Sequence, residues 1–130
     1  MPTDHIRLSC TARDQLITLK RRTGIGHWNV LARWAFCRSL AEVTCPPEAK
    51  LPADSNVEMT WKVFAGNHGE ELWALLRYRC HRDGLPLDED TLGQQFRLHL
   101  HRGIGYLVGD PRTSDIAGLI SLVSGSASGT

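Results

Sequence analysis

The sequence predicts a mainly α-helical fold that begins with a short strand followed by two helices. Apolar residues recur at helical spacing through most of the 130 residues, and glycines and prolines separate these stretches. Strict alternation of polar and apolar residues marks two short segments, 5–9 and 57–63. The length suits one compact domain and is too short for two. We expect a single domain over 1–109, followed by a weak helix and a disordered tail over 110–130.

The first alternating segment predicts a strand. Polar His5, Arg7 and Ser9 alternate there with apolar Ile6 and Leu8. A period of two places the polar side chains on one face of a strand and the apolar side chains on the other. The N-terminus is therefore expected to add a short strand to the domain.

Two helices are expected after this strand. The first would begin at Thr11, which has the capping-box spacing to Asp14, and end at Gly24. Its buried stripe would consist of Ala12, Leu16 and Leu19. The second would follow the turn at 24–26 and present a broad apolar stripe that contains Trp28, Leu31 and Ala35.

The second alternating segment, 57–63, fits two structures. Its alternation is typical of a strand, whereas Ser55 and Glu58 have the capping-box spacing of a helix start. We favour a helix here. The segment before it, 45–55, holds three prolines and is expected to be a surface loop.

Three further helices are expected in the C-terminal half. The first covers 70–83, since acidic residues open it, basic residues close it and Gly84 follows. The next is capped by Asp88 or Thr91, and its apolar face is formed by Leu92, Phe96, Leu100 and Gly103. A weak helix over 114–123 would precede the tail.

Charge is unevenly distributed along the chain. Residues 1–42 carry seven Lys or Arg and three Asp or Glu, whereas residues 43–130 carry eight and eleven. This asymmetry predicts a basic face in the first third of the chain. No apolar stretch is long enough to span a bilayer, and no signal peptide is recognisable, so we expect a soluble cytoplasmic protein without membrane contact. Its four cysteines are expected to be free thiols.

No catalytic or metal-binding pattern emerges from the remaining motifs. The glycine pairs in TGIGHW and RGIGYL lack the third glycine of a dinucleotide-binding loop. His99 and His101 point to different faces of a helix, so we interpret them as exposed or supporting residues. Asp88 begins an acidic cluster that is better explained as a helix cap. Cys37, which is close to Phe36 and Trp34 in the sequence, is expected to pack in the core. We expect neither an enzyme nor a cofactor.

A run of three cations is the strongest functional signal. Lys20, Arg21 and Arg22 end the first expected helix, and the turn after it brings Gly26, His27 and Asn29 to the start of the next helix, where backbone amides attract anions. Strand, helix and helix within about 40 residues is the layout of ribbon-helix-helix proteins, which pair strands between chains and present them to DNA.

Three stretches of the chain resemble a known family. TARDQLITLKRRTGIGHWNVLARWAFCRSLAE, WKVFAGNHGEELWALLRYRCHRDGLPLDEDTL and QFRLHLHRGIGYL are similar to the DndE family of DNA sulfur modification proteins, and the similarity runs from about Ile6 to Leu107. The resemblance implies a variant ribbon-helix-helix fold, a homotetramer, and binding of duplex DNA, with a preference for nicked DNA, through surface lysines. It also implies a place in the bacterial phosphorothioation apparatus, which replaces a backbone phosphate oxygen with sulfur.

The resemblance further implies protein partners. These are an iron-sulfur protein that resembles ATP pyrophosphatases and an SMC-like ATPase, while a cysteine desulfurase mobilises the sulfur. The cation run Lys20, Arg21 and Arg22 matches the family's basic segment at the end of the first helix, with arginine at two of the three positions. Guanidinium groups keep the phosphate contact but bind with a fork geometry that an ammonium lacks.

We therefore predict a DNA-binding accessory protein of the sulfur modification complex. The expected DNA contacts are Lys20, Arg21, Arg22, Arg7, Arg13, Gly26, His27 and Asn29. His5, Arg7 and Ser9 would face DNA if strands pair between chains, although a tetramer could bury them instead. Two alternatives are an ordinary ribbon-helix-helix transcriptional repressor and a DNA nickase, the second of which would require a metal or a nucleophile near Asp88 or His99.

Overall fold

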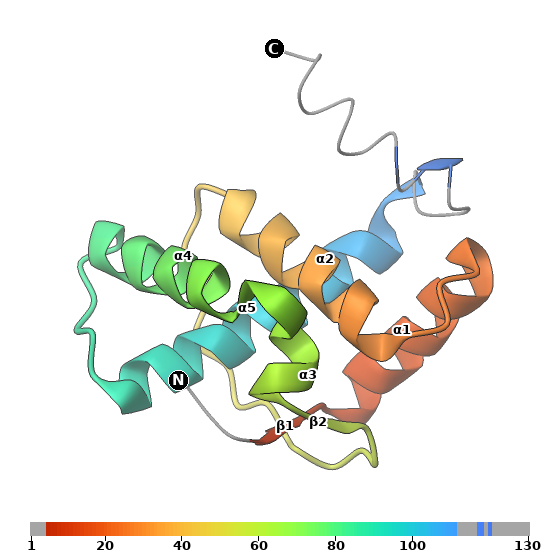
Figure 1. Cartoon of the computed structure of the whole chain (residues 1–130), viewed down its shortest axis with the longest axis horizontal. Helices are drawn as coiled ribbons and strands as arrows, with labels where there is room; N and C mark the ends of the chain where they lie inside the picture. Colours follow the sequence, from red (N-terminus) through yellow and green to blue (C-terminus); the bar gives the residue numbers. More distant parts are fainter. Residues whose placement is uncertain (1–4, 112–116, 119, 121–130) are drawn as a thin grey trace.

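The computed structural model describes residues 5–111, 117, 118 and 120, and it is mainly helical as expected. Figure 1 labels its elements. In chain order they are β1 (His5–Arg7), α1 (Cys10–Thr23), α2 (Trp28–Ala41), β2 (Glu58–Thr60), α3 (Trp61–Ala65), the 3-10 turn η1 (Gly66–His68), α4 (Gly69–Arg82) and α5 (Glu89–Gly109). Most of the helix expected over 114–123, and the tail after it, lie outside the described residues.

Helix α5 is the longest element, with 21 residues; in Figure 1 it starts below α4 and passes behind α3 and α2. It packs most extensively against α2 and also contacts α1 and α4. The α2–α5 crossing depends on Gly103, because a Cβ atom added there would overlap the carbonyl oxygen of Ala35. The two backbones are therefore in direct contact at this point, as only a residue without a side chain permits.

Aromatic rings from three helices form the centre of the core. Phe36 of α2, Phe64 of α3 and Phe96 of α5 have ring centroids 5.0–5.7 Å apart, mostly edge to face. Trp61 lies 5.4 Å from both Phe64 and Phe96. The short helix α3 is thus held by its aromatic side chains, since five residues form too few backbone hydrogen bonds to be stable alone.

The two strands form one small antiparallel sheet within the chain. Ile6 is paired with Met59 in its register, and both side chains are buried. The expectation of a helix over 57–63 is therefore wrong for Glu58–Thr60 and correct from Trp61 onward. The side chain of Thr60 accepts a hydrogen bond from the Val63 amide at 3.1 Å, so the strand ends directly in a helix cap.

The start of α1 differs from the expected one. Ser9, which the alternation placed on the polar face of the strand, is 6% exposed and caps the helix by accepting a hydrogen bond from the Ala12 amide at 3.1 Å. Its extended backbone, with ψ of 159°, gives it the geometry of a cap, whereas Thr11 lies inside the helix. Ser9 is consequently removed from any DNA-facing surface. The other end of α1 is as expected, because Gly24 has φ of 75° and stops the helix.

Candidate nucleic-acid interface

The three cations of the predicted site lie in the last turn of α1. Lys20, Arg21 and Arg22 precede Gly24, whose amide donates to the Lys20 carbonyl at 2.9 Å. Cations in this position complement the partial negative charge at the C-terminal end of a helix. The helix geometry therefore favours positive side chains here even before any ligand is present.

Each of these cations has a different environment. The Lys20 ammonium lies 4.0 Å from the centre of the Trp28 ring, and Arg22 donates to the Val108 carbonyl of α5 at 3.0 Å. Arg21 is exposed and makes no side-chain contact within the part of the chain that the structure describes. Lys20 is thus held by a cation–π contact and Arg22 by a hydrogen bond, whereas Arg21 is available to a ligand.

Arg13 extends this positive surface along α1. It lies seven residues before Lys20 and eight before Arg21, on the same side of the helix, with Ile17 between them. The Arg13 guanidinium also contacts Asp14 at 3.1 Å on the surface, a pair that costs little to exchange for a phosphate. A shallow hollow of about 490 Å³ lies beside Arg13 and is lined by Ile17, Trp28, Asn56, Val57 and Glu58.

The turn between the two helices is open to solvent. Gly26 and His27 are exposed, Asn29 is half-buried, and the side chain of His27 makes no capping bond at the start of α2. Amides of the first helical turn have no partner inside the helix, and no acidic residue lies in this turn. Because Lys20 packs on Trp28, the first residue of α2, the end of α1 and the start of α2 form one surface. We call it the cationic surface; its side chains are Arg13, Lys20 and Arg21, while Arg22 lies on the other side of α1 and contacts α5.

Arg7 is in a different situation from the other predicted contacts. It lies in β1, where its guanidinium pairs with Glu58 at 2.7 Å and donates to the Ser55 carbonyl at 3.1 Å. Glu58 also contacts His5 at 3.2 Å. The polar face of the strand is consequently less positive than the sequence suggested, because β2 supplies a carboxylate that partly neutralises it.

The acidic cluster at the start of α5 is a helix cap, as expected. Asp88 accepts hydrogen bonds from the Thr91 amide at 3.1 Å and from the Thr91 hydroxyl at 2.7 Å. These bonds, the hydroxyl first, hold the pKa of Asp88 below its usual value. Among the described residues, no group of three or more His, Cys, Asp or Glu is arranged to hold a metal ion.

Of the two expectations for the α5 histidines, exposed or supporting residues, exposure is wrong and a supporting role fits their hydrogen bonds. His99 is fully buried and its Nδ1 lies 2.8 Å from the Ser39 hydroxyl of α2, while its Nε2 has no hydrogen-bond partner among the described residues. Burial, aided by nearby Arg102 and Arg79, lowers the pKa of His99 to about 4. His101 is half-buried; its Nδ1 bonds the Arg97 carbonyl at 2.8 Å and its Nε2 accepts from the Ser9 amide at 3.3 Å.

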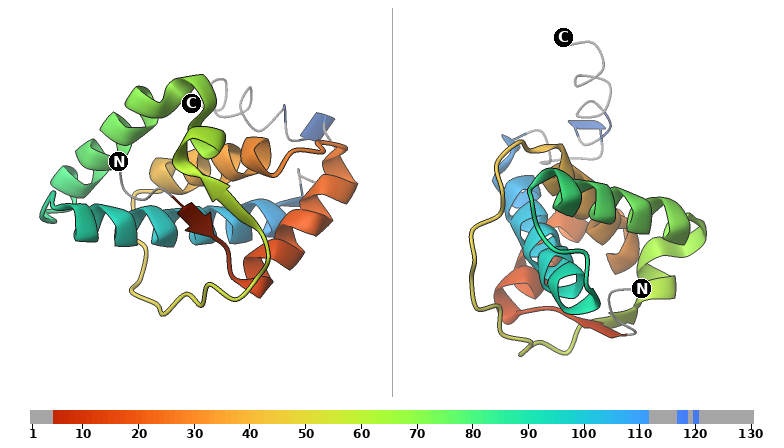
Figure 2. Two further views of the ribbon diagram at one scale, coloured as in Figure 1. Left: turned by 60° about the horizontal axis from the view of Figure 1, so that its bottom comes forward. Right: turned by 90° about the vertical axis from the view of Figure 1, so that its left-hand side faces the viewer.

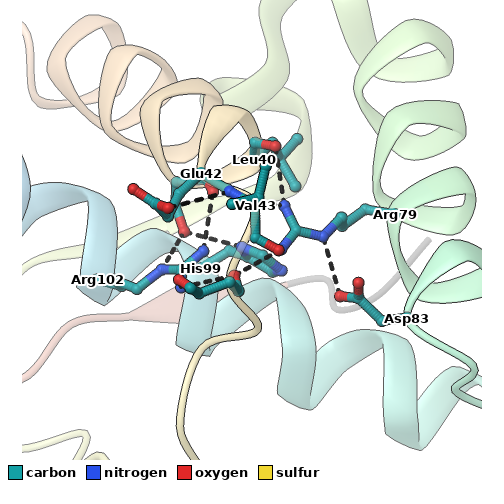
Figure 3. Close-up of polar contacts among 9 residues, drawn as sticks. Leu40, Glu42, Val43, Arg79, Asp83, His99 and Arg102 are labelled. Atoms are coloured by element: carbon teal, nitrogen blue, oxygen red, sulfur yellow. Dashed lines mark hydrogen bonds and ion pairs between the residues drawn. The ribbon is translucent and has the colours of Figure 1, made fainter.

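Two arginines near His99 bind carbonyl groups of the protein's own backbone (Figure 3). Arg79 of α4 donates to the carbonyls of Leu40, Glu42, Val43 and Thr44 and pairs with Asp83 at 2.9 Å. Arg102 of α5 donates to Ser39 and Thr44. The two arginines bind the carbonyls of Ser39 and Leu40 in the last turn of α2 and those of 42–44 directly after it, so they anchor this helix end and keep few donors for a ligand.

The cysteines show one further departure from expectation. Cys37 is exposed on α2, whereas Cys80 is the buried thiol, and burial raises the pKa of Cys80 to about 11. All four cysteines are free, as expected. No helix of the described chain has both the length and the apolar character needed to cross a membrane.

Two apolar residues beside these cations were not identified as part of the site from the sequence. Trp28 packs against the core, as its place in the apolar stripe of α2 predicted, but it also supports Lys20, and Ile17 is 47% exposed between Arg13 and Lys20. The helical spacing of 13, 17, 20 and 21 contained the signal for a shared face. The contact between Arg22 and Val108 joins residues 86 positions apart and had no such signal.

Comparisons with known proteins agree with this fold. The family model described as DNA sulphur modification protein DndE matches residues 5–115. The crystal structure of DndE from Escherichia coli B7A, involved in DNA phosphorothioation modification, is 26% identical, covers 82% of this chain and 98% of its own, and has a TM-score of 0.68.

A second crystal structure, of a DndE G21/24K mutant involved in DNA phosphorothioation, is 23% identical, covers 83% of this chain and 99% of its own, and has a TM-score of 0.65; at this identity it supports the fold alone. No curated protein sequence matches this chain significantly. The family match extends over most of the chain and over both helices of the cationic surface, so the chain belongs to the DndE family of DNA sulfur modification proteins.

Proposed function

We propose that this protein is the DNA-binding accessory subunit of the phosphorothioation apparatus and that it catalyses no step alone. In this proposal it binds duplex DNA, with a preference for nicked DNA, through the cationic surface. The observation that carries the proposal is the meeting of the cationic last turn of α1 with the open, acid-free first turn of α2. Side-chain cations and backbone amides together form a surface suited to phosphate groups.

Each cation would have a different role in DNA binding. Arg21, which is exposed and unpaired within the described chain, would contact a phosphate directly. Lys20 would present an ammonium already positioned by the Trp28 ring, so that less side-chain entropy is lost on binding. Arg22 keeps donors besides the one bonded to Val108, and Arg13 would extend the contact along α1.

Two features of the same surface support the proposed preference for nicked DNA. A nick makes the duplex easier to bend and exposes the faces of two base pairs. Ile17 and the half-buried Trp28 ring line the hollow beside Arg13, so apolar groups lie between cations that would hold the flanking phosphates. Contact between these apolar groups and an exposed base pair would favour the nicked duplex over the intact one.

Membership of the family supports the assignment of partners as well. We propose that the chain assembles into a homotetramer and works with the iron-sulfur protein and the SMC-like ATPase of the same apparatus. The cytoplasm is the expected location, since that is where the DNA to be modified lies.

The test is a fluorescence titration with duplexes of one sequence, intact or singly nicked, at two salt concentrations. The variant Lys20→Ala, Arg21→Ala, Arg22→Ala should lose most of its affinity, and the slope of log affinity against log salt should fall by about 0.9 for each phosphate contact removed. A matched control removes three exposed cations elsewhere, Lys50→Ala, Lys62→Ala, Arg77→Ala, and should bind almost as the wild type does.

Each outcome separates the proposal from its alternatives. Equal losses in both triple variants would show that net charge, and not the cationic surface, drives binding, and would refute the assignment. Binding to one intact operator about a thousandfold tighter than to random duplex would indicate a repressor instead. Accumulation of cut plasmid, abolished by Asp88→Asn or His99→Asn, would indicate a nickase.

A further inference from the structure

The outer face of α4 carries a stripe of apolar side chains that are exposed to solvent in the described chain. Leu75 is 48% exposed and Tyr78 is 64% exposed, and neighbouring Ala74 is exposed as well. Glu71 and Arg82 extend the same face toward the two ends of the helix. We call Glu71, Ala74, Leu75, Tyr78 and Arg82 the α4 stripe. Large exposed apolar side chains in a row mark interaction surfaces more often than chance exposure does.

The stripe has the spacing of a coiled-coil seam. Glu71, Leu75, Tyr78 and Arg82 are separated by four, three and four positions, which is the alternation of d and a positions in a heptad. The opposite side of α4, with Leu72, Leu76, Arg79 and Cys80, is buried in the core. The helix thus has a second, solvent-facing seam in addition to its core face.

We propose that a second copy of this chain packs antiparallel on the α4 stripe. A twofold axis that passes midway between Leu75 and Tyr78 pairs Leu75 of one copy with Tyr78 of the other. The same axis pairs Glu71 of one copy with Arg82 of the other, because both pairs are centred on the same point of the helix. One register therefore matches apolar with apolar and acid with base throughout, as an isologous interface requires.

Charge also selects the direction of pairing. A parallel arrangement would bring Glu71 near Glu71 and Arg82 near Arg82, and such like-charge contacts disfavour an interface. Arg82 makes no side-chain contact in the described part of the chain, and the contact of Glu71 with His68, at 3.9 Å between exposed side chains, is weak. Both charges are therefore available to a second copy in the antiparallel pair.

The size of the seam sets the expected strength. The 14 residues of α4 make a helix about 21 Å long at 1.5 Å per residue. An interface of this length is smaller than those of stable complexes, so we expect a dissociation constant in the micromolar range and a mass that depends on protein concentration. This inference specifies one contact of the proposed homo-oligomer and is independent of the proposed DNA contacts.

The test measures molar mass by sedimentation over a range of concentrations. Leu75→Glu should raise the dimer dissociation constant at least tenfold, and so should the charge reversals Glu71→Arg and Arg82→Glu made singly. The double reversal Glu71→Arg, Arg82→Glu should restore association, since every acid–base pair is reformed with its signs exchanged. The control is Val43→Glu, at a residue that is 76% exposed outside the stripe.

Several results would overturn the inference. A wild-type chain that stays monomeric at high concentration would refute both the seam and the homo-oligomer. A wild-type oligomer whose mass is unchanged by Leu75→Glu, or a double reversal no better than the single ones, would refute the seam and leave the oligomer in place. Circular dichroism of each variant verifies folding. The double reversal places a base near the N-terminus of α4 and an acid near its C-terminus, which the helix dipole disfavours. Restored association therefore cannot come from a more stable helix. DNA titration of Leu75→Glu with a short duplex separately tests the cationic surface.

Discussion

Buried polar side chains in this protein serve mainly to end helices. Arg79 is only 3% exposed, yet its one carboxylate partner, Asp83, accounts for a minority of its hydrogen bonds, and backbone carbonyls at the end of α2 take the others. Arg102 can only donate to the Ser39 hydroxyl, which leaves the hydroxyl hydrogen available to Nδ1 of a neutral His99. This set of hydrogen bonds therefore depends on His99 staying uncharged.

We predict that acid weakens the fold through His99. Its pKa is about 4 in the folded chain and 6.5 in the unfolded one, so the unfolded chain binds the extra proton between these values. The free energy of unfolding should be constant above about pH 6.5 and decrease as the pH falls toward 4, by roughly 3 kcal/mol at most. Denaturant titrations at several pH values measure this slope.

The matched variant for this prediction is His99→Asn, which keeps a hydrogen-bonding group near Ser39 but does not titrate. It should be less stable than the wild type at pH 8 and lose much of the pH dependence, while His101, whose pKa is also lowered by burial, retains part of it. Ile104→Val, a core change without a titratable group, should keep the wild-type slope. An unchanged slope in His99→Asn would contradict the assignment.

The sequence predicted which charged residues matter better than it predicted what surrounds each side chain in the fold. Lys20, Arg21 and Arg22 were identified because three cations follow one another in the sequence, and all three lie in the last turn of α1. The burial of His99 was missed, although it lies three positions after Phe96 and four before Gly103, on the same face of α5. The hydrogen bond from Arg22 to α5 could not be predicted, because it depends on tertiary packing and no local sequence pattern indicates it.

At the scale of elements, caps and close contacts decide where helices lie. Ser9 caps α1 and Thr60 caps α3, and each of them is the residue at which a strand segment turns into a helix. The segment 57–63 was ambiguous because it contains both a strand and a helix start, and only pairing with β1 separates them. Helices 70–83 and the one after Asp88 were predictable, since caps and apolar spacing agree there.

We predict that the α2–α5 crossing tolerates no side chain at Gly103. Gly103→Ala should force the Ala35 backbone away and lower the free energy of unfolding by about 3 kcal/mol or more, as overpacking of a close contact does. Gly105→Ala is the matched control, because nothing lies within 4 Å of its added Cβ atom. That change should stabilise α5 by up to about 1 kcal/mol through helix propensity. Equal effects of the two changes in denaturant unfolding would show that the crossing is not tight.

At the scale of the whole molecule, the fold separates two surfaces. Figure 1 and the left view of Figure 2 show α4 at one side of the molecule and α1 at the other. Helix α1 contacts α2 and α5 in the core, while α4 contacts α5 from the other side. The cationic surface and the α4 stripe therefore face different directions. Composition had indicated a basic first third, but only the packing of α5 between these helices sets the two surfaces apart.

This separation leads to a prediction about DNA bridging. A dimer formed through the α4 stripe would carry its two cationic surfaces on its outer ends, turned away from each other, so that each would bind a different duplex. Wild-type protein should therefore retain a fluorescent duplex on beads that carry a second, biotinylated duplex. Leu75→Glu should lose this bridging at least tenfold while its binding to a single short duplex is unchanged, because the variant keeps Arg13, Lys20, Arg21 and Arg22. The Val43→Glu control should bridge as the wild type does. Bridging that survives Leu75→Glu would assign the link between duplexes to another interface, and loss of both activities would show that the two surfaces are not independent.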